Sequence, residues 1–130
     1  MTERLAVDAN VIIDWLRKDA SAPSQLRKTH TIFVPLPVVG ELYAGAFSSA
    51  RHEENIAAIG SLLAEQEILL PDMDTAILYG RLRGEMRLQI IRHSKLNDIW
   101  IAALCIQHDL PLLTNDRGFD AISELRTIHW

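Results

Sequence analysis

The sequence predicts an α/β fold, a three-layer α/β/α sandwich whose central parallel sheet has four to five strands. Short apolar runs alternate with segments of helical periodicity along the whole chain, which is typical of a parallel sheet with helices on both faces. No repeat or linker interrupts this alternation, and a length of 130 residues is usual for one domain. We therefore expect a single domain over residues 1–130.

The expected elements follow one another in strand–helix order. Apolar runs predict strands at residues 4–7, 32–34, 68–70, 112–114 and 127–130, the last at an edge of the sheet. Helical periodicity predicts helices at residues 10–17, 38–47, 53–65, 72–88 and 98–106, with a helical turn at 119–122. Asp72 and Asp74 are expected to cap the fourth helix, whereas residues 21–31 form a loop or a short helix.

The composition is that of a globular protein, with 48% hydrophobic and 23% charged residues. No run approaches the roughly 20 apolar residues of a membrane span, and the N-terminus leads directly into a strand, so we expect no membrane association or signal peptide. The single cysteine, Cys105, lies in an apolar helical run, which favours a buried thiol in a reducing cytoplasm. A net charge of −4 argues against a passive nucleic-acid-binding module, but not against a nuclease that binds cations.

Four acidic residues stand where predicted strands end or helices begin: Asp8, Glu41, Asp98 and Asp116. In a parallel sheet these positions meet at the carboxyl edge, where ligands bind. Carboxylates gathered there repel one another, and a hard divalent cation such as Mg²⁺ relieves that repulsion. A cation held in this way can orient a water and neutralise charge on a phosphodiester.

Two polar residues are placed to support these acids. Asn10 is expected to orient Asp8 or a metal-bound water. Thr114 lies two residues before Asp116, so both side chains point to the same side of the strand, and its hydroxyl can donate a hydrogen bond to a carboxylate. Both residues have an alternative role, which is to satisfy the local backbone.

Four segments resemble the PIN domain family, and within it the small VapC-type toxin ribonucleases. The matching stretches read VDANVIID at 7–14, VGELYAG at 39–45, LNDIWIAA at 96–103 and LTNDRGF at 113–119, and the ending at 128–130 is also similar. The resemblance implies an endoribonuclease that depends on Mg²⁺ or Mn²⁺ and cleaves structured RNA such as tRNA or rRNA. It also implies a homodimer that is inhibited by a VapB-type antitoxin.

Carried over by position, the resemblance makes Asp8 and Asp98 the principal metal ligands, Glu41 the third acid and Asp116 the fourth. The densest positive stretch runs from Arg81 to Lys95 and leads into Asp98. We expect Arg87, Arg92 and Lys95 to hold RNA phosphates, with the solvated face of a helix as the alternative. The apolar stripe of residues 53–63 is a candidate docking surface for an antitoxin helix.

Three other functions remain open from the sequence. A signalling receiver domain also places acids at strand ends, but here Asp72 opens a helix after the third strand and Arg126 stands where a receiver has a lysine. A catalytically silent PIN fold that binds proteins is the second. A phosphatase or DNA nuclease with the same metal chemistry is the third, because the ion alone does not distinguish the sugar.

Overall fold

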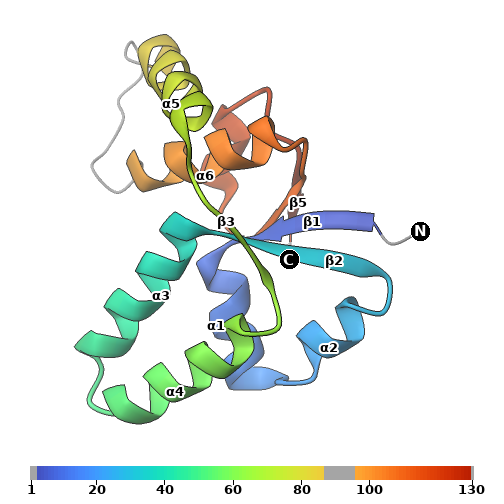
Figure 1. The fold of residues 1–130 in the computed structure, drawn as a ribbon, viewed down its shortest axis with the longest axis vertical. Coiled ribbons are helices and arrows are strands. Elements are labelled where there is room, and N and C mark those ends of the chain that lie inside the picture. The colour runs from blue at the N-terminus through green and yellow to red at the C-terminus, as the bar shows by residue number, and fades with distance from the viewer. Residues whose placement is uncertain (1–2, 87–95, 130) are drawn as a thin grey trace.

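The computed structural model describes residues 3–86 and 96–129, which form the predicted three-layer α/β/α sandwich around a parallel sheet (Figure 1). The sheet has five strands in the order β3-β2-β1-β4-β5, and every neighbouring pair is parallel. The strands are β1 (Glu3–Val7), β2 (His30–Pro35), β3 (Glu67–Leu69), β4 (Leu112–Thr114) and β5 (Thr127–His129).

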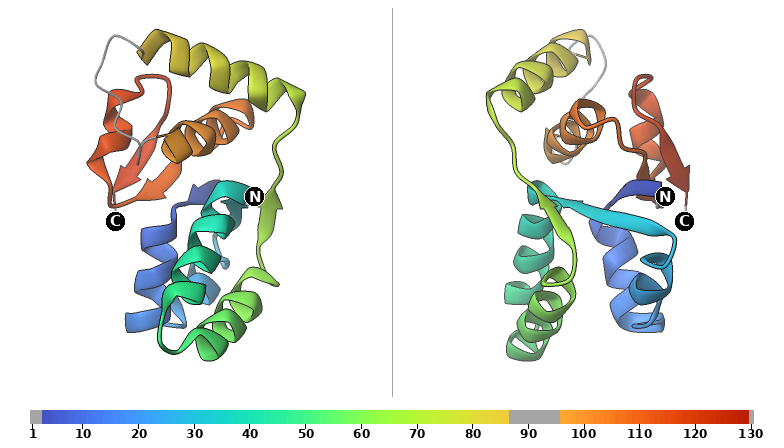
Figure 2. Two further views of the ribbon diagram at one scale, coloured as in Figure 1. Left: turned by 90° about the vertical axis from the view of Figure 1, so that its left-hand side faces the viewer. Right: turned by 45° about the vertical axis from the view of Figure 1, so that its right-hand side comes forward.

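Helices cover both faces of this sheet. One layer holds α1 to α4 and the other holds α5 and α6, as two further views show (Figure 2). Their bounds are α1 (Ala9–Lys18), α2 (Ala22–Leu26), α3 (Leu36–Ser48), α4 (His52–Leu63), α5 (Met73–Met86) and α6 (Leu96–Gln107), with the 3-10 helix η2 (Arg117–Ala121). None of the helices in these ranges is both long enough and apolar enough to cross a membrane.

The core lies between the central strands and the helices that flank them. Helix α1 buries one stripe that includes Val11, Ile12 and Trp15, as its periodicity predicts. Helix α6 is different, because its residues from Ile101 to Cys105 are all fully buried. A helix that is apolar on nearly every side is held in place by its surroundings, so the first turn of α6 has a fixed position relative to the sheet.

Several element boundaries differ from the predictions. Helix α6 begins at Leu96, two residues before the predicted start, so Asn97 lies in its first turn. The 3-10 helix η2 begins at Arg117, two residues before the predicted turn. The apolar stripe of α4 packs against the core, and its residue Ile59 also lines a groove between α1, α3 and α4.

The strand order also excludes the receiver domain, one of the alternative functions that the sequence left open. A receiver domain has the order 2-1-3-4-5 of the flavodoxin-like fold, whereas this sheet runs 3-2-1-4-5. After β1 the chain builds outward through β2 and β3, then returns to place β4 on the other side of β1. The switch point therefore lies between β1 and β4, and the carboxyl ends of the strands at such a point are where sheets of this kind bind ligands.

Candidate functional site

Asp8 lies at this switch point, directly after β1, and is only 5% exposed. It is the N-cap of α1, and its Oδ1 accepts a hydrogen bond from the backbone N–H of Ala9 at 2.8 Å. Its Oδ2 accepts from the Thr114 hydroxyl at 2.8 Å and from the Asn10 side-chain amide at 3.2 Å. Every one of these contacts fixes the direction in which the carboxylate points.

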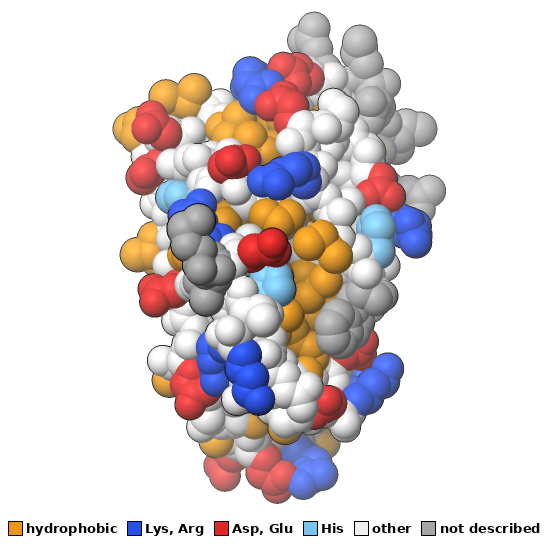
Figure 3. Space-filling view, turned by 90° about the vertical axis from the view of Figure 1, so that its right-hand side faces the viewer, with side chains coloured by type: hydrophobic (Ala, Val, Ile, Leu, Met, Phe, Trp, Pro, Cys, Tyr) orange, Lys and Arg blue, Asp and Glu red, His pale blue; other side chains and the backbone are white. Residues whose placement is uncertain are grey.

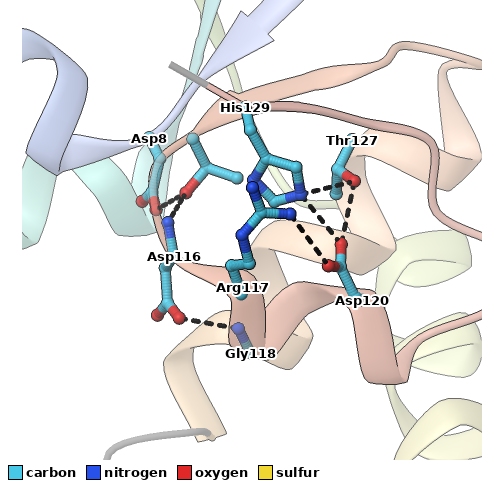
Figure 4. A network of polar contacts seen from close by, with 8 residues as sticks. Asp8, Asp116, Arg117, Gly118, Asp120, Thr127 and His129 are labelled. Carbon is cyan, nitrogen blue, oxygen red and sulfur yellow. Dashed lines mark hydrogen bonds and ion pairs between the residues drawn. The ribbon is translucent and has the colours of Figure 1, made fainter.

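The Thr114 hydroxyl joins the ends of the two central strands. Thr114 is fully buried at the end of β4, and while its hydroxyl donates to Asp8, it accepts from the backbone N–H of Asp116 at 3.0 Å (Figure 4). The Asp116 carboxylate in turn accepts from the backbone N–H of Gly118 at 2.8 Å and caps η2. Asp8 and Asp116 thus belong to one hydrogen-bonded network although they are far apart in the sequence.

Glu41 and Asp98 approach this edge from two helices. Glu41 lies in α3 and accepts a hydrogen bond from the side-chain amide of Asn97, which is in the first turn of α6. Asp98, partly buried, is the next residue in that turn. Because one hydrogen bond fixes Asn97 against Glu41, the turn that carries Asp98 also lies beside α3.

The acids of this site influence one another electrostatically. Burial is the largest cause that raises the pKa of Asp8, and the negative charge of Asp116 raises it further, while hydrogen bonds from Thr114, Ala9 and Asn10 oppose the change. The pKa of Glu41 is raised first by desolvation and then by the charge of Asp8, and the Asn97 hydrogen bond opposes this. Asp8 is therefore within the field of acids from two other segments.

The donor set of the site fits a hard, hydrated cation. Its side chains offer carboxylate oxygens, and an oxygen that accepts one hydrogen bond retains a lone pair for a metal. Within residues 3–86 and 96–129, no group of three side chains from Asp, Glu, His and Cys is close enough together to enclose a metal ion. Mg²⁺ usually keeps several waters and takes one or two carboxylates directly, so an open arrangement suits it better than it suits zinc.

Asn97 is the site residue that sequence reasoning missed. Its only signal in the sequence is its place immediately before Asp98, because its partner Glu41 is 56 residues away. By contrast, the sequence suggested a contact of Asn10 with Asp8 and a hydrogen bond from Thr114 to a carboxylate, and in the structure both residues donate to Asp8.

The predicted RNA-binding residues Arg87, Arg92 and Lys95 lie outside the described residues. Arg81, the first cation of the same stretch, hydrogen bonds both oxygens of Glu124 at 2.7 and 2.8 Å and Glu85 at 3.0 Å. It therefore ties α5 to the loop before β5. Asp72 accepts a hydrogen bond from the backbone N–H of Thr75 at 3.0 Å, as expected of a helix cap.

A parallel sheet with helices on both faces and hydrogen-bonded carboxylates at its switch point places the chain among the α/β proteins whose ligand site is expected at the carboxyl ends of the strands. The family model of the PIN domain matches residues 5–125. The chain belongs to the PIN domain family.

Known proteins of this family resemble the chain over nearly its whole length. Ribonuclease VapC1 of Haemophilus influenzae strain R2866 is 30% identical over 130 residues, which covers 95% of this chain and 96% of that protein. The solved structure of VapBC2 from Rickettsia felis, bound to a DNA fragment from its promoter, has a TM-score of 0.85 at 26% identity and covers 98% of both chains. VapBC-1 from nontypeable Haemophilus influenzae has a TM-score of 0.81 at 27% identity, again over 98% of both chains.

The raised pKa of Asp8 gives a testable pH dependence. Because the folded chain holds the Asp8 proton more tightly than the unfolded chain, ionised Asp8 lowers the free energy of unfolding at neutral pH, and this penalty vanishes below about pH 4. We expect Asp8→Asn to melt at or above the temperature of the parent at pH 7 in chelator, with the difference shrinking toward pH 4.

Thermal melting between pH 4 and pH 8 measures this difference. Asp74→Asn, which removes an exposed acid from the first turn of α5, controls for the loss of one charge. A difference between Asp8→Asn and the parent that stays constant over the whole range would contradict the raised pKa.

Proposed function

We propose that this chain is a metal-dependent endoribonuclease and the toxin of a VapBC-type toxin–antitoxin pair. Its substrate in this proposal is structured cytoplasmic RNA, of the kind found in tRNA or rRNA. The observation that carries the proposal is the Asp8–Thr114–Asp116 network at the switch point of the sheet, in a chain that belongs to the PIN domain family. The similarity to a ribonuclease VapC1 over nearly the full length supports the choice of RNA.

In this proposal the four acids hold Mg²⁺ or Mn²⁺, with Asp8 and Asp98 as the principal ligands and Glu41 and Asp116 as further ligands. A divalent ion bound there supplies charge neutralisation and an oriented water for phosphodiester hydrolysis. The protein's own contribution is orientation. Thr114 and Asn10 fix Asp8 from two sides, and Asn97 fixes Glu41.

A simple charge argument supports the need for metal. The site gathers carboxylates, and an RNA phosphate approaching them is also negative. Hydrolysis adds a water oxygen to phosphorus and releases a sugar oxygen, which increases the negative charge further. Without a cation, the negative charge of the carboxylates repels both the approaching phosphate and the charge that develops during hydrolysis. We therefore expect no cleavage in chelator.

Cleavage of RNA by the purified chain tests the class of enzyme. Loss of a metal ligand removes several kcal/mol of transition-state stabilisation, so Asp98→Asn should lower the cleavage rate on the order of 10²–10³-fold. Asp74→Asn is the matched control, since it makes the same substitution in the first turn of another helix. Discrete products from a tRNA transcript, with Mg²⁺ and not with chelator, are the expected result.

Two outcomes of this assay would redirect the proposal. Equal cleavage of DNA of the same sequence would favour a nuclease without sugar selection. The absence of any cleavage by the parent with Mg²⁺ or Mn²⁺ would favour a silent PIN domain that acts by binding.

Asn97→Ala should have a smaller effect through Glu41. Removing the hydrogen bond frees the Glu41 side chain to rotate, and loss of such an orienting partner typically costs about 10–100-fold in metal affinity or activity. Titration of bound Mn²⁺ by electron paramagnetic resonance measures the affinity without relying on cleavage. Asn55→Ala, whose amide hydrogen bonds Ser49 away from the acids, is the control. Unchanged Mn²⁺ affinity in Asn97→Ala would show that the contact is structural only.

The antitoxin part of the proposal has support from an apolar groove. Similar solved structures are of VapBC pairs. In this chain a groove of about 300 Å³ lies between α1, α3 and α4, where Ile13, Leu16, Leu42 and Ile59 line it and Arg17 adds a cation. An amphipathic helix with an acidic residue beside its apolar stripe would fit this groove.

Ile13→Lys should disrupt antitoxin binding, because it places a charge at the mouth of the groove. Ile68→Lys is a closely matched control, since Ile68 is 36% exposed on β3 and Ile13 is 37% exposed. The assay is co-purification of the tagged chain with a co-expressed VapB-type antitoxin. Retention of that protein by both variants would place the antitoxin elsewhere.

The proposal also includes a homodimer. Leu70, Met73 and Ile77 are exposed large apolar side chains along the segment from β3 into α5, and they give a second copy an apolar surface to cover. Sedimentation of the purified chain measures the oligomeric state, and a monomer across the working concentration range would remove this part of the proposal.

A further inference from the structure

Arg117 is a cation at the edge of the site that the functional analysis so far leaves without a role. It follows Asp116 directly and is the first residue of η2. Its side chain is 76% exposed. Figure 4 shows it beside the Asp8–Thr114–Asp116 network, with its guanidinium directed toward Asp120. No cation in the sequence is nearer along the chain to one of the four acids.

The contact between Arg117 and Asp120 is weak. Its nitrogen and oxygen are 4.0 Å apart, which is beyond hydrogen-bond distance. Arg81 and Arg126 differ, because each makes hydrogen bonds of about 3 Å or less to an acidic side chain. An exposed ion pair without hydrogen bonds contributes little to stability, so moving the Arg117 side chain away from Asp120 costs the fold little.

Asp120 keeps its position without Arg117. Its Oδ1 accepts a hydrogen bond from the Thr127 hydroxyl at 3.0 Å and lies 3.1 Å from Nε2 of His129. Both partners belong to β5, so Asp120 anchors η2 to the edge of the sheet. Arg117 faces the other oxygen, Oδ2. The guanidinium can therefore leave while the backbone that carries Asp116 stays fixed.

The charge distribution makes a cation at this place useful. The chain has a net charge of −4, and the face in Figure 3, on the side of the molecule where β1 begins, mixes positive and negative side chains. Because the chain as a whole carries no excess of positive charge, a polyanion that reaches the acidic site has to be held by individual cations beside it. Guanidinium groups bind phosphate oxygens with paired, charge-assisted hydrogen bonds, which Asp120 at 4.0 Å does not offer.

We propose that Arg117 exchanges its contact with Asp120 for a backbone phosphate of the RNA substrate and so positions the strand at the carboxylate site. This inference rests on the proposed ribonuclease function. It assigns phosphate binding to a residue of η2, separate from the arginine and lysine positions 87, 92 and 95. Backbone contacts of this kind fix the register of a nucleic acid and carry no sequence preference.

The test measures RNA binding against salt in an Asp98→Asn background, which prevents cleavage, with a tRNA transcript as the probe at fixed low Mg²⁺. Each phosphate contact adds about 0.7–0.9 to the slope of log affinity against log salt. We expect Arg117→Gln to lower the slope by about that amount. Arg126→Gln is the matched control, since Arg126 precedes β5 at the opposite ends of the strands and should leave the slope unchanged.

Arg117→Lys separates charge from geometry. It keeps the positive charge and loses the planar fork, so we expect the parent slope with a weaker affinity. Melting temperatures within error of the parent for all three variants show that binding changes are not folding changes.

Arg117→Gln with the slope of the parent would overturn the inference, as would an equal decrease in Arg126→Gln. The proposed function is judged separately, by cleavage in the chain that retains Asp98. Cleavage together with an unchanged Arg117→Gln slope removes only this inference, whereas a parent that neither binds nor cuts RNA removes both.

Discussion

The buried hydroxyl of Thr114 holds the ends of β1 and β4 together, and the geometry of the site depends on that contact. It donates to Asp8 and accepts from the backbone of Asp116, so two acidic segments share one oxygen atom. Burial of Asp8 is the main cause of its raised pKa, and the negative charge of Asp116, which repels that of Asp8, raises it further. The apolar core on either side of the central strands must offset this repulsion for the edge to keep its shape.

The core supplies that rigidity through two different kinds of helix. Helix α1 buries a stripe and begins at Asp8, which serves both as its cap and as a site acid. Helix α6 is buried on nearly every side and carries Asn97 and Asp98 in its first turn. Asp8 and Asp98 are therefore both attached to elements that the core holds in place. Such rigidity is what a site needs in order to hold a cation with few protein ligands.

The sequence was sufficient for the parts of this arrangement that follow from local pattern. Strand ends are visible in apolar runs, and parallel strands bring their carboxyl ends to one edge, so the gathering of Asp8 and Asp116 was predictable. A hydrogen bond from Thr114 to a carboxylate was also predicted, but the sequence did not specify Asp8 as the acceptor, because that contact depends on the pairing of β4 with β1. The Asn97–Glu41 hydrogen bond was not predicted, since it depends on how α3 and α6 pack, and helical periodicity gives the buried face of a helix but not its neighbour.

The surroundings of Arg117 illustrate the same limit at the surface. Its relation to Asp120 requires a 3-10 helix, and that of Asp120 to His129 requires the register of β5 on β4, neither of which a short polar segment reveals. Arg81 and Arg126 both hydrogen bond to acidic side chains of other segments, and Arg81 in this way joins α5 to the loop before β5. A cationic side chain that binds a polyanion has to be one whose contacts within the protein are not required for the stability of the fold. On this argument the strength of an arginine's contacts within the protein, more than its exposure, distinguishes a structural cation from one reserved for a ligand.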